Sequence, residues 1–202
     1  MAIKLVVFDA DKTLWSHPNV SDLTLPFKLV NPDVVSDAKG ETFHLFDGIR
    51  EMLKTLQELG IITTVASWNK SEPVKQALQL FSIGKFFKVV KVEFHPNKHL
   101  MIESTLSELA EDEVKPKPEE ILYVDDRDLH IDKVRERVGL IHFIQVWVDA
   151  KKPGDILEYV EELGKERGCQ NILARTLSVF ILWVSRANSF GSIPKAKARS
   201  SE

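Results

Sequence analysis

The 202-residue sequence has a single cysteine, Cys169, so it cannot form an internal disulfide. This shortage excludes a secreted scaffold held together by disulfides and favours a reducing compartment, so we expect a cytoplasmic protein. The sequence also lacks long apolar runs. Apart from the N-terminal stretch, the apolar run that stands out is 177–184, which is much shorter than the roughly 20 apolar residues that a membrane span needs. The apolar N-terminal stretch reaches Asp9 and Asp11 at once, which is unlike a secretory signal. We therefore expect a soluble protein with no transmembrane segment.

The sequence also has no large excess of positive or negative charge. The chain has 27 Lys and Arg against 30 Asp and Glu, a net charge of −3, which provides no general field to attract nucleic acid. With 44% hydrophobic and 28% charged residues, the composition is that of a globular protein. The length suits one domain with an appendage.

The C-terminal segment 167–202 differs from the rest of the chain. Its basic residues are accompanied by no acid before Glu202. The segment is either a basic amphipathic element for a membrane surface or a partner, or a dispensable extension whose apolar part packs on the domain or on another copy. The sequence therefore leaves a homodimer open.

Short apolar runs alternate with segments of helical periodicity through residues 1–166, which predicts a doubly wound α/β domain with a parallel, Rossmann-like sheet. The predicted strands are 3–8, 61–66, 87–94, 121–124 and 141–146. The predicted helices are 49–59, a helix that begins at residue 71, 98–111, 131–138 and 154–165. Most of the strands lack alternation, as is typical of strands covered by helices on both faces.

Residues 15–46 interrupt this alternation. They contain three prolines and a turn at 37–40, after which Phe43 and Leu45 alternate with their neighbours. This pattern predicts a short β-hairpin, or flap, after the first strand rather than a helical insertion.

Chemically reactive side chains follow the predicted strands at their carboxyl ends, where open α/β sheets bind ligands. These residues are Asp9, Asp11, Ser67, Trp68, Lys98, Asp125 and Asp126. Carboxylates crowded at one edge repel one another unless a hard cation lies among them, and oxygen ligands of this kind suit Mg²⁺. An ammonium group, a hydroxyl and a backbone N–H group supply what a phosphate dianion needs. The set therefore points to metal-assisted phosphoryl transfer, in which one carboxylate can act as nucleophile and another as general acid and base.

Segment 9–14, Asp-Ala-Asp-Lys-Thr-Leu, resembles the first motif of the haloacid dehalogenase (HAD) superfamily of phosphohydrolases. The later motifs are matched, in the superfamily's order, by Ser67, by Lys98 and by the pair Asp125 and Asp126. Trp15 and segment 66–69, Ala-Ser-Trp-Asn, make the sequence similar to the magnesium-dependent phosphatase-1 subfamily. The resemblance covers about residues 3–148.

The resemblance implies a role for each of these residues. Asp9 would be the nucleophile and a Mg²⁺ ligand, and Asp11 would be the general acid and base, with its backbone carbonyl on the metal. Asp126 would bind the metal directly, and Asp125 would act through water or as a support. The residues that would hold the transferring phosphoryl group are Ser67, Trp68 and Lys98.

Two departures from the superfamily's pattern concern loops near the site. Lys12 stands where many relatives have glycine, so the first loop must accommodate a side chain there. Residues 128–130 replace the Arg-Asn that often follows the acids of the fourth motif in the subfamily. Trp15 and Trp68 directly follow the first and second motifs, and we expect both to line the site.

The spacing of the motifs leaves no room for an independent cap domain, which needs roughly 50 residues or more. We therefore expect a capless core with an open site. Such a site suits small phosphorylated molecules and also phosphoproteins, and the resembled subfamily is associated with both phosphorylated sugar adducts and protein phosphotyrosine. We expect a Mg²⁺-dependent phosphomonoester hydrolase that acts on small metabolites such as sugar phosphates through a phosphoaspartyl intermediate. The alternatives are a protein tyrosine phosphatase and a non-enzymatic binding module that acts through its flap and tail.

Overall fold

The computed structural model describes residues 2–165. The predicted basic extension, 167–202, lies outside the described residues. Residues up to Gly164 belong to one compact unit. Among the described residues, no helix combines the length and the apolar character that crossing a membrane requires.

A five-stranded parallel sheet forms the centre of this unit, with the strand order β6-β5-β1-β7-β8. Its strands are β1 (Leu5–Phe8), β5 (Ile62–Trp68), β6 (Phe87–Glu93), β7 (Ile121–Asp125) and β8 (His142–Gln145). In the register of the central strand, Val6 lies between Thr63 of β5 and Leu122 of β7. After the central strand β1, the chain adds β5 and β6 on one side of the sheet and then β7 and β8 on the other. The expected doubly wound α/β fold is therefore confirmed.

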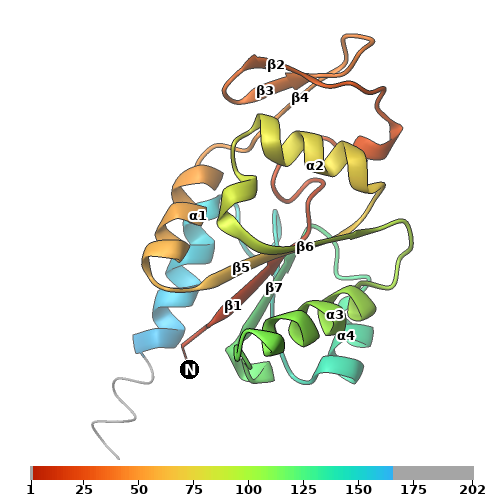
Figure 1. Ribbon diagram of the computed structural model, residues 1–202. Coiled ribbons are helices and arrows are strands. Elements are labelled where there is room, and N and C mark those ends of the chain that lie inside the picture. The colour runs from red at the N-terminus through yellow and green to blue at the C-terminus, as the bar shows by residue number, and fades with distance from the viewer. Residues whose placement is uncertain (1, 166–202) are drawn as a thin grey trace, which may run out of the picture. The chain divides into compact units, whose positions relative to one another are not determined.

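Helices cover both faces of the sheet (Figure 1). They are α1 (Ile49–Glu58), α2 (Ser71–Leu80), α3 (Lys98–Glu111), α4 (Ile131–Val138) and a helical segment at 153–165, with short 3₁₀ turns η1 (Val20–Asp22), η2 (Gly84–Phe86) and η3 (Pro118–Glu120). Helices α1, α2 and segment 153–165 pack on the face that carries Val6 and Phe8. Helices α3 and α4 pack on the opposite face, with Leu5 and Val7. All four residues of β1 are therefore buried, which explains why the strand shows no alternation of apolar and polar residues.

The predicted first strand starts two residues earlier than β1. Lys4 still exchanges backbone hydrogen bonds with both neighbours, since its N–H donates to Glu120 and its carbonyl accepts from Ile62. The difference therefore concerns the boundary of the strand rather than its place in the sheet.

The insertion after β1 forms a second sheet, with three antiparallel strands instead of the two of the predicted hairpin. The strands are β2 (Lys28–Asn31), β3 (Val34–Ser36) and β4 (Thr42–His44). The missed strand is β2: all four of its residues are exposed, so it carries no buried stripe that a sequence pattern could show. On β4 the expected alternation holds, since Phe43 is buried between two exposed neighbours. The Phe43 ring packs edge-on against Trp15 and Phe81, which fixes this sheet to the core.

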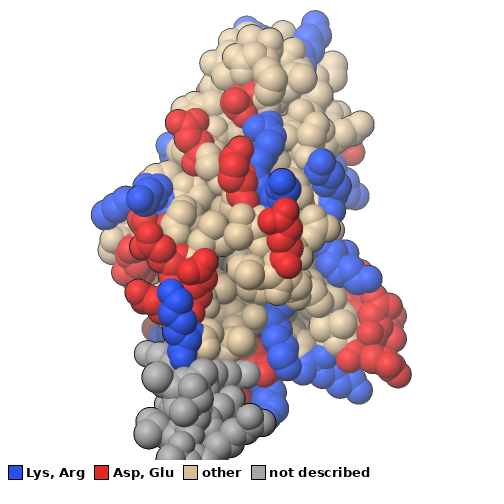
Figure 2. Space-filling view, turned by 90° about the vertical axis from the view of Figure 1, so that its left-hand side faces the viewer, with Lys and Arg blue, Asp and Glu red and all other residues tan. Residues whose placement is uncertain are grey.

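Figure 2 shows the face on which α1 and segment 153–165 lie. Acidic and basic side chains are interspersed there, in keeping with the small net charge. The upper end of this view, where the three-stranded sheet lies in Figure 1, is mostly uncharged. In that sheet, Leu29 and Val30 of β2 are exposed apolar residues.

Candidate active site

Four neighbouring segments bring the predicted residues together at one edge of the central sheet. Asp9 directly follows β1, Ser67 lies near the end of β5, and Asp125 ends β7. Lys98 is the first residue of α3, the helix that follows β6. These four residues are almost fully buried, with exposed fractions of 3% or less. The convergence follows from parallel strand order, which places all carboxyl ends at the same edge.

Lys98 is the electrostatic centre of the site. Its ammonium group donates to the Asp9 carboxylate, to the Ala66 carbonyl at 2.8 Å and to the Asp125 carboxylate at 3.2 Å. These contacts use all three N–H donors of the group. Burial lowers the pKa of Lys98, but the attraction of the two carboxylates outweighs this effect, so the pKa is raised and the ammonium stays charged.

For Asp9, the effect of burial on the pKa outweighs the effect of the neighbouring Lys98 charge. Burial raises the pKa of Asp9 to about 7, although Lys98 lowers it, and Asp125 raises it further. Protonation of Asp9, or a cation at its oxygens, therefore relieves the cost of holding two carboxylates beside one ammonium group.

Asp125 is held by three protein donors. It accepts from Lys98, from the backbone N–H of Arg127 at 3.0 Å and from the hydroxyl of Tyr123. Burial alone would raise the pKa of Asp125, but Lys98 and then Tyr123 outweigh it, so the pKa is lowered and the carboxylate is ionised. Burial also keeps the pKa of Tyr123 well above its ordinary value, so its hydroxyl remains a donor. Sequence reasoning missed Tyr123; the available signal was its spacing of two from Asp125 on one strand, which puts both side chains on the same face.

Replacing Tyr123 by phenylalanine is expected to lower the free energy of unfolding by about 1–2 kcal/mol, because a buried carboxylate loses one of its donors. Urea denaturation of the wild-type protein and the variant measures this loss. Tyr159→Phe is the control: it removes a hydroxyl that lies 2.9 Å from the ring of His142 outside the site, and its loss should be smaller. No loss for Tyr123→Phe would show that the bond to Asp125 contributes nothing, and equal losses would show that it contributes no more than the contact of Tyr159 with His142.

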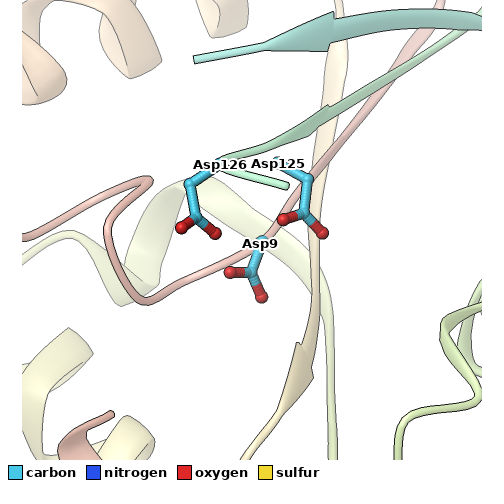
Figure 3. Close-up of side chains that lie close together, drawn as sticks. All are labelled: Asp9, Asp125 and Asp126. Carbon is cyan, nitrogen blue, oxygen red and sulfur yellow. The ribbon is translucent and has the colours of Figure 1, made fainter. Parts of the chain in front are cut away.

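Three carboxylates form a group that fits a divalent cation. One oxygen each of Asp9, Asp125 and Asp126 lies within 4.8 Å of the others (Figure 3). Asp126 is partly exposed, and burial together with the charge of Asp125 raises its pKa to about 6. Crowded hard oxygen donors at the mouth of a buried anionic site match the preferences of Mg²⁺. Because the oxygens of Asp125 already accept from protein donors, Asp9 and Asp126 have the greater capacity to bind a metal.

Asp11 lies two residues beyond Asp9 and is held separately. Its carboxylate accepts from the indole N–H of Trp15 at 2.7 Å, from the Asn69 amide at 2.7 Å and from the Val20 backbone N–H at 3.3 Å. Burial raises the pKa of Asp11, and the hydrogen bonds from Asn69 and Trp15 oppose this shift. Trp15, which we expected to line the site, is instead fully buried behind Asp11, because its ring fills the space against Phe43.

The carboxylates open onto a cleft of about 530 Å³. Its lining residues are Asp9, Asp11, Lys12, Pro18, Asn19, Trp68, Asn69, Phe94, Asp126 and Arg127. Trp68 lines the site as expected, with 38% of its surface exposed, and Phe94 exposes 69%. Ser67 and Lys98 are nearly inaccessible to solvent and reach the cleft through Asn69 and Asp9, which they contact directly.

Lys12, in the loop that directly follows Asp11, adopts a left-handed backbone conformation with φ of 55°. This conformation favours glycine, which explains why many relatives have glycine where this chain has lysine. The Lys12 carbonyl accepts a hydrogen bond of 2.6 Å from the indole of Trp147, which anchors the loop.

The chain is similar to known phosphatases. A family model described as Acid Phosphatase matches residues 1–146. Human magnesium-dependent phosphatase 1 is 30% identical over 140 residues, which are 69% of this chain and 77% of the human protein.

Solved structures share the fold at lower identity. A HAD-superfamily hydrolase from Ehrlichia chaffeensis superimposes with a TM-score of 0.59 at 16% identity, over 80% of this chain and 98% of that one. The N-terminal part of a Bacteroides fragilis protein, containing a phosphatase domain and complexed with Mg, gives a TM-score of 0.53 at 19% identity. That match covers 79% of this chain but only 39% of the Bacteroides chain.

Proposed function

From the premise that the chain belongs to the acid phosphatase family and is a magnesium-dependent phosphatase, we propose that it hydrolyses phosphate monoesters through a phosphoaspartyl intermediate on Asp9. The observation that carries the proposal is the joint burial of Asp9, Asp125 and Lys98 beside the partly exposed Asp126. A buried carboxylate next to one ammonium group and a cation site suits attack on a phosphorus atom.

In the first step the Asp9 carboxylate attacks phosphorus, and the bond from phosphorus to the leaving oxygen breaks. Asp11, in its protonated form, gives its proton to that oxygen, so the leaving group departs as a neutral alcohol or phenol. The raised pKa of Asp11 that burial causes supports this role.

In the second step water attacks the phosphorus of the aspartyl phosphate, and the bond between phosphorus and the Asp9 oxygen breaks. The Asp11 carboxylate takes the proton of the attacking water and is then ready to act as an acid again. Inorganic phosphate and the free Asp9 carboxylate are the products.

Asp9, Asp126 and the backbone carbonyl of Asp11 would hold Mg²⁺, with Asp125 behind them as a support. When bound, Mg²⁺ supplies charge neutralisation for the phosphoryl oxygens. The backbone N–H of Trp68, a residue that lines the cleft, would bind a phosphoryl oxygen, and the fully buried Ser67 would support the site through Asn69. All three donors of Lys98 are engaged by protein acceptors, which favours a contribution through its charge.

The substrates we propose are small phosphorylated metabolites such as sugar phosphates, which an open, capless site can admit. One observation favours the alternative, a phosphotyrosyl protein. The exposed rings of Trp68 and Phe94 both line the cleft, and aromatic walls suit an aromatic leaving group.

Steady-state hydrolysis of phenyl phosphate, a sugar phosphate and a phosphotyrosyl peptide tests the proposal, each with Mg²⁺ and with EDTA. We expect turnover that requires Mg²⁺, and the ratio of kcat/KM values decides between the two substrate classes. Full turnover in EDTA would contradict the metal-assisted mechanism. No turnover of any ester by folded, Mg²⁺-supplied protein would favour a non-enzymatic binding module.

Mg²⁺ binding is expected to tighten as the pH rises from about 5 to about 8, because protons and metal compete for the same oxygens. The pKa of Asp9 is raised to about 7 and that of Asp126 to about 6, in both cases chiefly by burial. Below these values the folded protein binds protons that the metal must displace. Isothermal titration calorimetry in buffers of different ionisation enthalpy gives both the Kd and the number of protons released. An affinity that is constant over this range would show that these carboxylates are not the ligands.

A further inference from the structure

Asn69 occupies a central place that none of the catalytic motifs assigns to it. Its amide nitrogen donates to the Asp11 carboxylate at 2.7 Å and to the Ser67 hydroxyl at 3.1 Å. Its amide oxygen accepts from the Ser21 hydroxyl at 2.6 Å. The side chain is 97% buried, with 3% exposed, and every polar group it has is engaged.

The orientation of the Asn69 amide is determined by its surroundings. The backbone N–H of Lys70 donates to Ser21 Oγ at 2.7 Å, so the hydrogen of that hydroxyl is free to point at Asn69. The Asp11 carboxylate and the Ser67 oxygen accept from the NH₂ group, so this group faces them and the amide oxygen faces the Ser21 hydroxyl. Ser21 is itself fixed in the 3₁₀ turn η1, whose Asn19 side chain accepts from the Ser21 N–H at 3.2 Å.

The same contacts orient the Ser67 hydroxyl. Because Ser67 Oγ accepts from Asn69, its own hydrogen points away from the amide. One amide group thus joins the acid that serves the leaving group to a fully buried hydroxyl on β5.

We infer that Asn69 is a positioning residue that ties Asp11 to the buried Ser67, so that the proton of Asp11 is aimed at the leaving oxygen of a substrate in the cleft. The inference rests on the proposed function. Ser21 supports Asn69 and has the same effect to a smaller degree.

This role predicts a loss of activity that depends on the leaving group. A nitrophenolate departs with little help from an acid, whereas an alkoxide needs the proton. For Asn69→Ala we expect kcat/KM to fall about 100-fold for an alkyl phosphate and by about 10-fold or less for 4-nitrophenyl phosphate, because Asp11 keeps its donors from Trp15 and Val20 but loses its alignment. Ser21→Ala should shift the ratio in the same direction by a smaller factor.

The experiment measures kcat/KM for glycerol phosphate and 4-nitrophenyl phosphate with wild type, Asn69→Ala, Ser21→Ala, Asp11→Asn and the double variant Asn69→Ala/Asp11→Asn. Asn31→Ala, on the exposed strand β2, is the matched control and should leave both values unchanged. In the Asp11→Asn background, Asn69→Ala should leave the ratio of the two substrates unchanged, because the acid through which Asn69 acts is already missing. Thermal melts check that each variant is folded.

Two results would overturn the inference. One is an equal loss of kcat/KM for the two substrates in Asn69→Ala; the other is the same change in the ratio of their kcat/KM values with and without Asp11. Either result would mean that Asn69 affects only the structure of the site. If Asn69→Ala does not fold, the ratio in Ser21→Ala decides instead. Failure of the proposed function looks different: the wild-type protein would then hydrolyse neither ester in the presence of Mg²⁺.

Discussion

Replacing Asp9 by asparagine is expected to lower kcat for any accepted phosphate ester by roughly 10⁴-fold or more, because an amide cannot form the acyl phosphate. Within residues 2–165, Asp9 is the one carboxylate that both contacts Lys98 and lines the cleft. Its loss therefore removes the nucleophile and a metal oxygen together. Steady-state and single-turnover rates with Mg²⁺ measure the effect.

The same substitution should not unfold the protein. Wild-type Asp9 is buried at a cost, as its raised pKa of about 7 shows, and the variant leaves Lys98 paired with Asp125. Urea denaturation without Mg²⁺ should give an unfolding free energy equal to or above that of the wild type. Asp112→Asn, an exposed change remote from the cleft in a residue that pairs with Lys88, is the matched control and should keep full activity. Residual turnover of Asp9→Asn near the wild-type level would contradict the assignment of the nucleophile.

Lys98→Met is expected to lower the free energy of unfolding of the Mg²⁺-free protein by about 3–5 kcal/mol, because it leaves two buried carboxylates without their shared cation. Asp9 and Asp125 are 3% and 0% exposed, so water cannot replace the ammonium group. Activity should fall by roughly 100-fold or more as the charge beside the nucleophile is lost. Urea denaturation curves in EDTA measure the stability change.

Addition of Mg²⁺ should restore part of the stability of Lys98→Met, because a second cation then neutralises the same oxygens. The control is Lys91→Met, whose ammonium pairs with Glu108 at 2.6 Å at the surface and should contribute only about 0–1 kcal/mol. If both lysine variants unfold at the same urea concentration as the wild type, Lys98 is not the electrostatic centre of the site.

The sequence predicted most of the central fold because its signals are local. The bounds of α3 and α4 agree with the predicted ranges 98–111 and 131–138, where helical periodicity is bordered by Pro96 and Gly139. The five strands of the main sheet are at their predicted places, with ends that differ by one or two residues. Strand β2 was missed because an edge strand with four exposed residues buries no face.

The ordered motifs also predicted which carboxylates and which lysine meet at the sheet edge, because parallel strands bring their carboxyl ends together. The residues that support them were not predictable in the same way. Tyr123 and Asn69 matter through contacts with Asp125 and Asp11, and such contacts exist only once strands and turns are placed beside one another. Trp15 follows the first motif, as a lining residue would, yet Phe43 from a distant strand covers its ring.

The most direct test of the account is chemical trapping of the phosphorylated enzyme. Wild type and Asp11→Asn are mixed with 4-nitrophenyl phosphate and Mg²⁺, quenched in acid, reduced with borohydride and digested for mass spectrometry. Reduction converts an aspartyl phosphate into homoserine. We expect homoserine at position 9, with more of it in Asp11→Asn because the general base that activates the water for hydrolysis of the intermediate is missing. Asp9→Asn and samples in EDTA should contain none. Release of phosphate by an active enzyme with no modified residue at position 9, or with homoserine elsewhere, would contradict the central claim.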